Sequence, residues 1–216
     1  MSERGVFITF EGGEGSGKST QLRLLAHRLE AAGVRVRALR EPGGTAVGEA
    51  IRTILLDPEH TGLDDTTEIL LYEAARAQLV AEVIEPALDA GEAVLCDRFY
   101  DSTTAYQGHA RGIDLDEVSA LNRAASGGLT PDRTIVLDID PRLGIKRATS
   151  HGADRLEGED LAFHDAVRAG FLLIAAEEPA RVRVVDAHGT VDEVAERVAA
   201  ALRDVPEIAL ALGLRP

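Results

Sequence analysis

The chain has 216 residues, 45% of them hydrophobic, and this length fits one domain with an extensive core. Its 37 acidic and 23 basic residues give a formal net charge of −14 at pH 7, and no block of lysines and arginines occurs. This balance argues against a nucleic-acid binder, which usually presents a basic face, so an anionic ligand must be bound by a few locally placed cations.

The first half of the chain alternates apolar strands with amphipathic helices. Strands are expected at residues 6–10, 34–39 and 93–96. A glycine-rich turn over 11–19 follows the first strand and leads into a helix over 20–32. Thr45 can cap a helix over 46–56. The longest helix is expected over 66–90, with Pro86 bending it near its end.

The second half continues the alternation. We expect a helix in two pieces over 102–127, broken around 108–112, and then a strand over 133–138. A helix over 141–149 precedes a polar loop at 150–160, followed by a helix over 161–178, a strand over 182–186 and a helix over 191–203. The order predicts an α/β fold with a five-stranded parallel sheet and helices on both faces, as one domain over 1–216. The sequence does not decide whether the segment after Pro206 packs.

A phosphate-binding loop is indicated by the sequence GGEGSGKS at 12–19, which matches the pattern G-x-x-x-x-G-K-S/T between an apolar strand and a helix. Glycines let backbone N–H groups turn inward around an anion, and the helix directs its positive end at the phosphates. We predict that Lys18 neutralises the β and γ oxygens of ATP and that Ser19 ligates Mg²⁺. The motif predicts a P-loop NTPase fold but does not separate a kinase from a GTPase or ATPase. The predicted ATP-binding residues are Gly12, Gly13, Glu14, Gly15, Ser16, Gly17, Lys18, Ser19 and Thr20.

A carboxylate and an arginine follow the strand at 93–96. In a P-loop fold this is where a carboxylate orients Mg²⁺, and we assign that role to Asp97, together with Ser19. Arg98 would point into the cleft at the carboxyl end of the strand, where open α/β sheets bind ligands. The alternative is that both residues only cap or pair locally.

Several short motifs occur in a specific order along residues 7–198. They are FITFEG at 7–12, EPGG at 41–44, AAR at 74–76, DRFY at 97–100, AYQG at 105–108 and DRLE at 154–157. In this order and spacing they resemble the thymidylate kinase family. The resemblance implies phosphorylation of dTMP to dTDP with ATP and Mg²⁺, for dTTP synthesis, and a short lid at about 150–160.

The resemblance also implies roles for the substrate-binding residues. Arg52 and Arg98 would hold the acceptor phosphate, Tyr72 would stack on the pyrimidine, and Arg76 would hydrogen-bond its edge. Planar arginine forks suit phosphate oxygens and carbonyl edges. Alternatively, Tyr72 belongs to a core stripe, and Arg52 and Arg76 are solvated helix charges. The remaining implied contacts are Glu14 near the sugar 3′-hydroxyl and the metal, Pro42 in the pocket wall, Thr103 and Gln107 at the base, and Tyr106 against the 2′ carbon, favouring deoxyribose.

The family's catalytic arginine has no obvious counterpart in this chain. Some members carry it in the P-loop, where this sequence has Glu14-Gly15-Ser16, and others have a strongly basic lid, whereas residues 148–152 are sparsely basic. The candidates that remain are Arg147 and Arg155, acting with Lys18 and Arg98. The family also often has Phe where Tyr72 stands, so the Tyr72 hydroxyl needs a partner.

Two other classes of function stay open from the sequence. One is another P-loop kinase, such as a cytidylate or deoxynucleoside kinase; a nucleoside kinase needs a base for a neutral hydroxyl, and Glu11 or Asp97 could serve. The other is a nucleotide-gated switch or partitioning ATPase. A dTMP kinase needs no such base, because the acceptor phosphate is mostly dianionic at pH 7.

The cellular setting is predicted from cysteine usage and hydropathy. Cys96 is the one cysteine, which excludes an internal disulfide, and the six histidines show no metal-ligand spacing. The chain enters an apolar strand too early for a signal peptide, and no apolar run reaches about 18 residues. We expect a cytoplasmic protein with ATP and dTMP as its small-molecule partners and no nucleic acid or membrane partner. The family resemblance implies a homodimer through helices outside the cleft.

Overall fold

A central parallel sheet organises the protein. The computed structural model describes residues 4–60, 62–148, 155–156 and 158–214. Five strands lie in the order β2-β3-β1-β4-β5, and every neighbouring pair is parallel. This confirms the predicted α/β fold and its strand count. The strands are β1 (Phe7–Glu11), β2 (Val36–Arg40), β3 (Ala93–Asp97), β4 (Arg133–Asp138) and β5 (Val182–Asp186).

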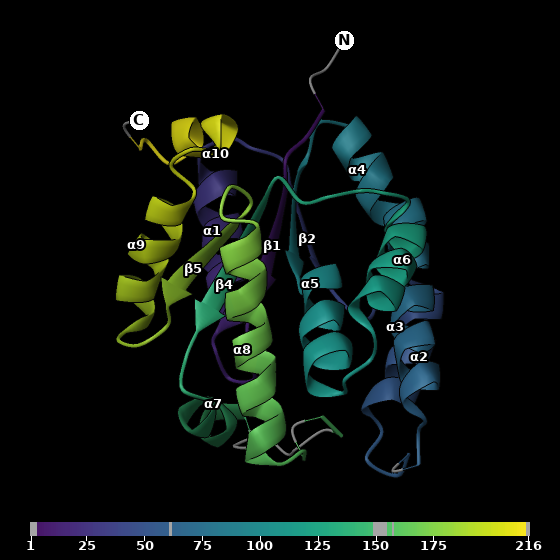
Figure 1. The fold of residues 1–216 in the computed structure, drawn as a ribbon. Coiled ribbons are helices and arrows are strands. Elements are labelled where there is room, and N and C mark those ends of the chain that lie inside the picture. The colour runs from purple at the N-terminus through teal and green to yellow at the C-terminus, as the bar shows by residue number, and fades with distance from the viewer. Residues whose placement is uncertain (1–3, 61, 149–154, 157, 215–216) are drawn as a thin grey trace.

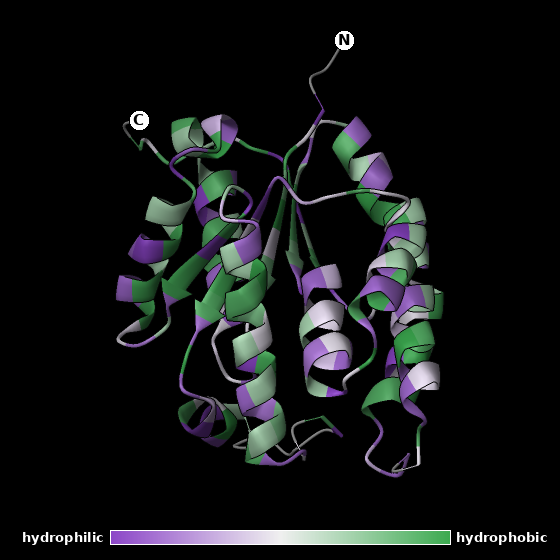
Figure 2. Cartoon of the chain, in the orientation of Figure 1, coloured by the Kyte–Doolittle hydropathy of each residue, from purple (hydrophilic) through white to green (hydrophobic). Residues whose placement is uncertain are grey.

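Alternate residues of the central strands pack against helices on opposite faces of the sheet. Ile8, Phe10 and Leu95 belong to a core with α1 (Lys18–Ala31), α9 (Val191–Ala201) and α10 (Pro206–Ala211). Phe7 and Val94 face the other way, against the helical run that begins with α3 (Asp65–Leu79). Figure 2 shows the hydrophobic strands enclosed between these layers.

The second face is covered by two groups of helices, which lie side by side in Figure 1. α8 (Leu161–Glu177) packs on a π-helix, η2 (Thr104–Ala110), and α3 packs on α2 (Ala46–Leu56) and α6 (Leu115–Ser126). Short helices α5 (Tyr100–Thr103) and α7 (Pro141–Ala148) follow β3 and β4. The described part of the chain begins and ends at the end of the sheet opposite α7 (Figure 1).

Polar caps set several helix starts. Thr45 caps α2 as predicted, because its hydroxyl oxygen accepts a hydrogen bond from Gly48 N at 2.9 Å. The Asp64 carboxylate caps α3 in the same way, and Thr190 and Glu193 form a reciprocal capping box on α9. These local bonds explain why the helix starts were predictable from residue type.

The predicted helix over 66–90 is helical throughout but not uniformly α-helical. After α3, the segment η1 (Val80–Ile84) is a π-helix, and α4 (Glu85–Asp89) follows with Pro86 in its first turn. Proline has no N–H and its ring crowds the preceding turn, and the π-helical segment lies in that turn. The predicted helix is therefore divided into an α, a π and a second α segment.

Three further expectations need correction or completion. The break predicted around 108–112 is wrong at its start: η2 continues through Gly108 to Ala110. Gly108 lies within this helix and packs against α6, where a Cβ would lie 2.7 Å from Leu115 Cδ2. The first helix begins at Lys18 rather than at residue 20, directly after Gly17. The segment after Pro206 does pack, since Ile208 on α10 is fully buried in the core.

No helix in the described ranges is both long and apolar enough to cross a membrane.

Candidate active site

The P-loop forms a tight cradle between β1 and α1. Gly12, Gly15 and Gly17 have φ values of 131°, 61° and 95°, which L side chains rarely adopt. The Lys18 side chain is buried against the loop, with Nζ 3.1 Å from Gly12 O and 2.9 Å from Gly13 O. Backbone N–H groups in such a loop can enclose an anion, with the lysine charge held over it.

Helix α7 fixes the outer side of the P-loop by close backbone packing. A Cβ at Gly144 would collide with the carbonyl oxygen of Glu14, and one at Gly15 would lie 3.1 Å from Arg147 Cβ. This close packing of α7 on the P-loop places Arg147 beside the loop. Sequence analysis missed Gly144, because nothing in the local sequence separates a packing glycine in a helix from an incidental one.

A hydroxyl and a carboxylate meet at the sheet edge next to the P-loop. Strand β3 pairs with β1 so that Asp97 lies opposite Phe10, and the Ser19 hydroxyl donates a hydrogen bond to Asp97 Oδ2. Hydroxyl and carboxylate oxygens suit Mg²⁺, which usually takes its other ligands from phosphates and water. No group of three or more His, Cys, Asp or Glu side chains in the described residues could hold a metal by itself.

Arg98 is held above the P-loop in an unusual backbone conformation. It is the one non-glycine residue in the described ranges with a positive φ, 73°. Its guanidinium donates to Glu14 Oε1 at 2.7 Å and to Ser102 Oγ at 3.2 Å. The Tyr106 hydroxyl donates to the same Glu14 oxygen at 2.6 Å. Burial opposes ionisation of Glu14, but the charges of Arg98 and Lys18 outweigh it and lower the pKa of Glu14 to about 2.

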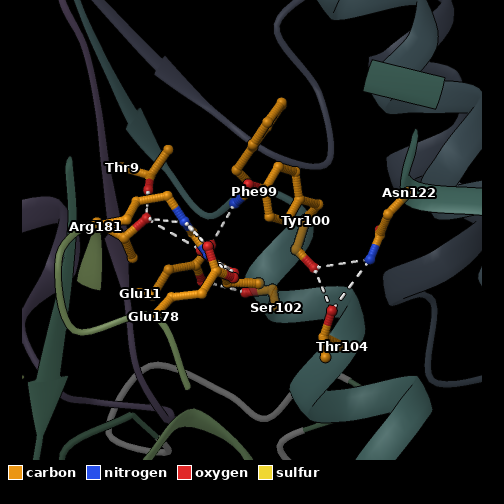
Figure 3. A network of polar contacts seen from close by, with 11 residues as sticks. Thr9, Glu11, Phe99, Tyr100, Ser102, Thr104, Asn122, Glu178 and Arg181 are labelled. Carbon is orange, nitrogen blue, oxygen red and sulfur yellow. Dashed lines mark hydrogen bonds and ion pairs between the residues drawn. The ribbon is translucent and has the colours of Figure 1, made fainter. Parts of the chain in front are cut away.

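A buried carboxylate stabilises this turn. Glu11 accepts hydrogen bonds from Phe99 N at 2.7 Å and from Ser102 Oγ at 2.5 Å (Figure 3). Burial, and then the negative charge of Asp101, raises the pKa of Glu11 to about 8. A positive φ at a non-glycine residue costs roughly 1–3 kcal/mol, so it needs such support from its surroundings. Glu11 was predicted only as an alternative base, but here it holds Phe99 and Ser102, the residues that follow Arg98 in the turn.

Arg76 lies in the interior and not on a solvated helix surface. Only 2% of its surface is exposed, and its guanidinium donates to Glu41 Oε2 at 2.8 Å and Glu73 Oε1 at 2.6 Å. Asn122 Oδ1 accepts a third bond at 3.2 Å, while Asn122 Nδ2 donates to Thr104 Oγ1 (Figure 3). The two carboxylates outweigh burial and raise the pKa of Arg76. Neither Glu73 nor Asn122 was predicted as a partner of this arginine, although Glu73 stands three residues before Arg76 on α3, a spacing at which opposite charges can pair.

The predicted substrate residues meet in one cavity of about 680 Å³. Arg52 lies on its wall and donates to Pro42 O at 2.8 Å. Thr103 also lines it and is 1% exposed, and its hydroxyl oxygen finds no hydrogen-bond partner among the described residues. A buried hydroxyl without a partner in a cavity wall is suited to a ligand. All nine predicted substrate residues line this cavity: Glu14, Pro42, Arg52, Tyr72, Arg76, Arg98, Thr103, Tyr106 and Gln107.

The donor-side residues line the same cavity. These include Lys18, Ser19, Asp97 and Arg147. Gly12 and Gly13 line a smaller cavity behind the loop. A phosphate-binding loop and an arginine-lined pocket thus open into one space.

Comparison with known proteins gives the family. A family model described as thymidylate kinase matches residues 10–198. The thymidylate kinase of Solidesulfovibrio magneticus is 52% identical over 201 residues, covering 89% of this chain and 96% of the relative. The thymidylate kinase of Syntrophotalea carbinolica is 53% identical over 199 residues, which cover 89% of this chain and 92% of the relative. The chain belongs to the thymidylate kinase family.

A solved thymidylate kinase has the same fold. The crystal structure of the enzyme from Ehrlichia chaffeensis superimposes with a TM-score of 0.77 at 37% sequence identity, covering 93% of this chain and 99% of that one. The P-loop NTPase fold expected from the GGEGSGKS motif is thereby confirmed, because the match spans almost the whole of both chains.

The two arginines predicted for the lid of this thymidylate kinase family member lie in different places. Arg147 lines the cavity beside Gly15, whereas Arg155 is not among the described residues that line it. Arg155 forms an ion pair with Glu68, and its Nε donates to Leu55 O at 2.9 Å. Residues 150–154 and 157 of the predicted lid lie outside the described residues.

Sequence analysis missed one wall of the cavity altogether. The loop and helix after β5 contribute to the lining, as does one residue next to Arg155. Parallel strands direct their following loops to the same edge of the sheet, so the loop after β5 could have been nominated from topology alone. These residues are Leu156, Ala187, Gly189, Thr190, Val191 and Val194.

Proposed function

We propose that this cavity transfers the terminal phosphoryl group of ATP to dTMP, giving ADP and dTDP for dTTP synthesis, within one domain formed by residues 1–216. The observation that carries the proposal is the meeting of two cation groups in one cavity of about 680 Å³. Lys18 and Arg98 lie together at the P-loop, where each donates a hydrogen bond to Gly12 O, and Arg52 lines the cavity where it donates to Pro42 O. Two polyanions can be brought end to end only if such cations reduce their repulsion.

The donor side binds ATP through the P-loop. Its backbone N–H groups and Lys18 hold the phosphates, and Arg147 lies close enough to the loop to approach the migrating phosphoryl group. Ser19 and Asp97 would hold Mg²⁺, which neutralises phosphate oxygens when bound. Of the two lid candidates, the position of Arg147 beside Gly15 favours it as the donor-side arginine, and Arg155 has a supporting role.

The acceptor side binds dTMP in the orientation needed for in-line attack. Arg98 and Arg52 hold its phosphate, and Arg76 donates to the edge of the base. Thr103 and Gln107 complete base recognition, and Tyr72 stacks on the ring. An aromatic face contributes about 1–3 kcal/mol per stacked base.

Glu14 and Tyr106 would face the sugar. Their mutual hydrogen bond of 2.6 Å fixes both side chains. Tyr106 then crowds the 2′ carbon, which favours deoxyribose. Closure of the segment at about 150–160 excludes water from the transfer.

The described part of the site offers cations to a phosphate acceptor, and the two carboxylates considered as a base for a neutral hydroxyl are both engaged. A dianionic phosphate oxygen attacks without losing a proton. Glu11 has both oxygens engaged, by Phe99 N and Ser102 Oγ, and Asp97 is engaged by Ser19. Those contacts favour a nucleotide kinase over the alternative of a nucleoside kinase, which needs a base at the reacting hydroxyl.

A cytoplasmic homodimer is also proposed. Helices α2, α3 and α6 pack together on the flank of the sheet (Figure 1) and expose Val47 (51%), Ile54 (41%), Leu70 (50%) and Leu115 (46%). Burial of such side chains between two copies would remove apolar surface from water. Sedimentation analysis tests this, and a monomer at micromolar concentration contradicts it.

The experiment that tests the function is a coupled ADP-release assay with ATP and Mg²⁺ across nucleoside monophosphates and unphosphorylated thymidine. We expect dTMP-dependent release of ADP and none with thymidine. Release at the same rate without an acceptor would instead identify an ATPase switch.

A further inference from the structure

Glu68 on α3 is a fully buried carboxylate to which neither the motifs nor the proposed mechanism gives a role. It joins three segments that are distant in sequence. Gln107 Nε2 on η2 donates to Glu68 Oε1 at 2.8 Å, and Arg111 Nε lies 3.4 Å from the same oxygen. Arg155 forms an ion pair with Oε2. Glu68 therefore connects the base-recognition residue Gln107 to two cations outside the cavity.

The two arginines keep this carboxylate ionised. Arg111 Nη2 lies 3.4 Å from Glu68 Oε2, on the side where Arg155 pairs. Burial opposes ionisation, but the hydrogen bond from Gln107 and the charges of Arg111 and Arg155 outweigh it and lower the pKa of Glu68. Arg111 is itself held by Glu159 at 2.6 Å, so the cation cannot readily swing away.

An ionised carboxylate only accepts hydrogen bonds, and this fixes the polarity of Gln107. The amide nitrogen of Gln107 must face Glu68, because its carbonyl oxygen would meet a negative charge there. The oxygen then lies on the other side of the carboxamide. Gln107 lines the cavity whereas Glu68 does not, so a base bound in the cavity would meet the side of the carboxamide that faces away from Glu68.

This polarity distinguishes pyrimidines by chemistry. Thymine and uracil carry an N3–H donor, whereas cytosine has an N3 lone pair beside an amino group. A carbonyl oxygen accepts a hydrogen bond from the N3–H of thymine or uracil but is repelled by the N3 lone pair of cytosine. A carboxamide that could rotate by half a turn would present either group and would discriminate less.

We propose that Glu68 is a positioning residue that locks the Gln107 carboxamide with its carbonyl oxygen toward the base, so that the site selects pyrimidine monophosphates with an N3–H. The inference rests on the proposed function, because it takes dTMP as the acceptor. Glu68 does not contact substrate; it acts through Gln107.

The test compares kcat/KM for dTMP and dCMP in the wild type and in Glu68→Gln. Glutamine can accept or donate, so it leaves both orientations of Gln107 satisfied. We expect the preference for dTMP over dCMP to fall by about tenfold or more, mainly through a higher KM for dTMP. The matched control is Glu82→Gln, because the exposed Glu82 carboxylate also accepts from a glutamine, Gln78, at 2.7 Å, outside the residues that line the cavity.

A double-mutant cycle shows whether the effect passes through Gln107. In a Gln107→Ala background, Glu68→Gln is expected to leave the preference unchanged. If Glu68→Gln does not fold, Glu68→Asp retains the charge but withdraws it from Gln107, and the preference should again fall.

Two results overturn the proposal. One is an equal loss of kcat/KM for both substrates, with the ratio preserved, which indicates a purely structural carboxylate. The other is a change in the ratio that persists without the Gln107 side chain. Absence of dTMP-dependent ADP release from the wild type would be a separate failure, that of the proposed function.

Discussion

The buried arginine at the base of the acceptor pocket allows a quantitative prediction. Arg76→Met removes the guanidinium that bridges Glu41 at 2.8 Å and Glu73 at 2.6 Å but keeps an unbranched side chain. Both carboxylates stay buried without their counter-charge. Removing one partner of a buried ion pair typically costs about 3–5 kcal/mol. For a domain of this size each kcal/mol lowers Tm by about 2–4 °C, so we expect a loss of about 6–20 °C.

The loss should depend on pH in a direction set by Glu41. Burial raises the pKa of Glu41 from its ordinary value of 4.5 to about 7, although the charge of Arg76 opposes the rise. Between those values the folded protein binds this proton more strongly than the unfolded chain, so the contribution of Glu41 to stability falls as pH rises. Removing Arg76 raises the pKa of Glu41 further, so the pH range over which Glu41 contributes less stability as pH rises extends to higher pH. Arg76→Met should therefore lose less stability at pH 6 than at pH 8.

Thermal unfolding followed by circular dichroism at both pH values measures this. Arg123→Met, at an exposed position on α6, serves as the control for loss of one positive charge. A loss of less than about 1 kcal/mol, in the range of exposed ion pairs, would refute the reasoning, as would equal losses at pH 6 and pH 8.

Three further predictions concern the donor side. Lys18→Ala should lower kcat/KM about 10²–10³-fold with the fold intact by circular dichroism, and near-normal turnover would refute its role. Gly144→Ala should displace the P-loop, because a Cβ there collides with the Glu14 carbonyl oxygen, and lower kcat by about 10²-fold; unchanged kcat would contradict the packing. Arg147→Ala should lower mainly kcat, whereas Arg155→Ala should mainly raise KM for dTMP; steady-state kinetics showing the reverse would exchange the two assignments.

The features that local physics determines were predictable from sequence. The strand at 133–138 and the helix over 46–56 have the predicted bounds, because an apolar run or a capped amphipathic segment carries its own signal. The P-loop was predictable because its motif specifies backbone turns, a cation and the start of a helix in consecutive positions. The topology then brought Asp97 beside Ser19 through the pairing of β1 with β3.

The supporting residues were not predictable, because their roles arise from tertiary contacts. Glu11 was expected only as an alternative base and Glu73 had no expected role, yet one holds the residues after Arg98 and the other pairs with Arg76. Gly108 was expected to break the helix, but it lies within η2 and packs against α6. The placement of Arg155 against Glu68 likewise depends on chain segments more than 80 residues apart.

The central claim is that one cavity binds the phosphates of both nucleotides end to end. A bisubstrate compound in which adenosine and thymidine are joined through a chain of phosphates tests it most directly, by steady-state inhibition. We predict that it competes with ATP and with dTMP alike, and that Lys18→Ala and Arg98→Ala each weaken its binding. Competition with only one substrate would show that the two sites do not form one cavity, and would contradict the account.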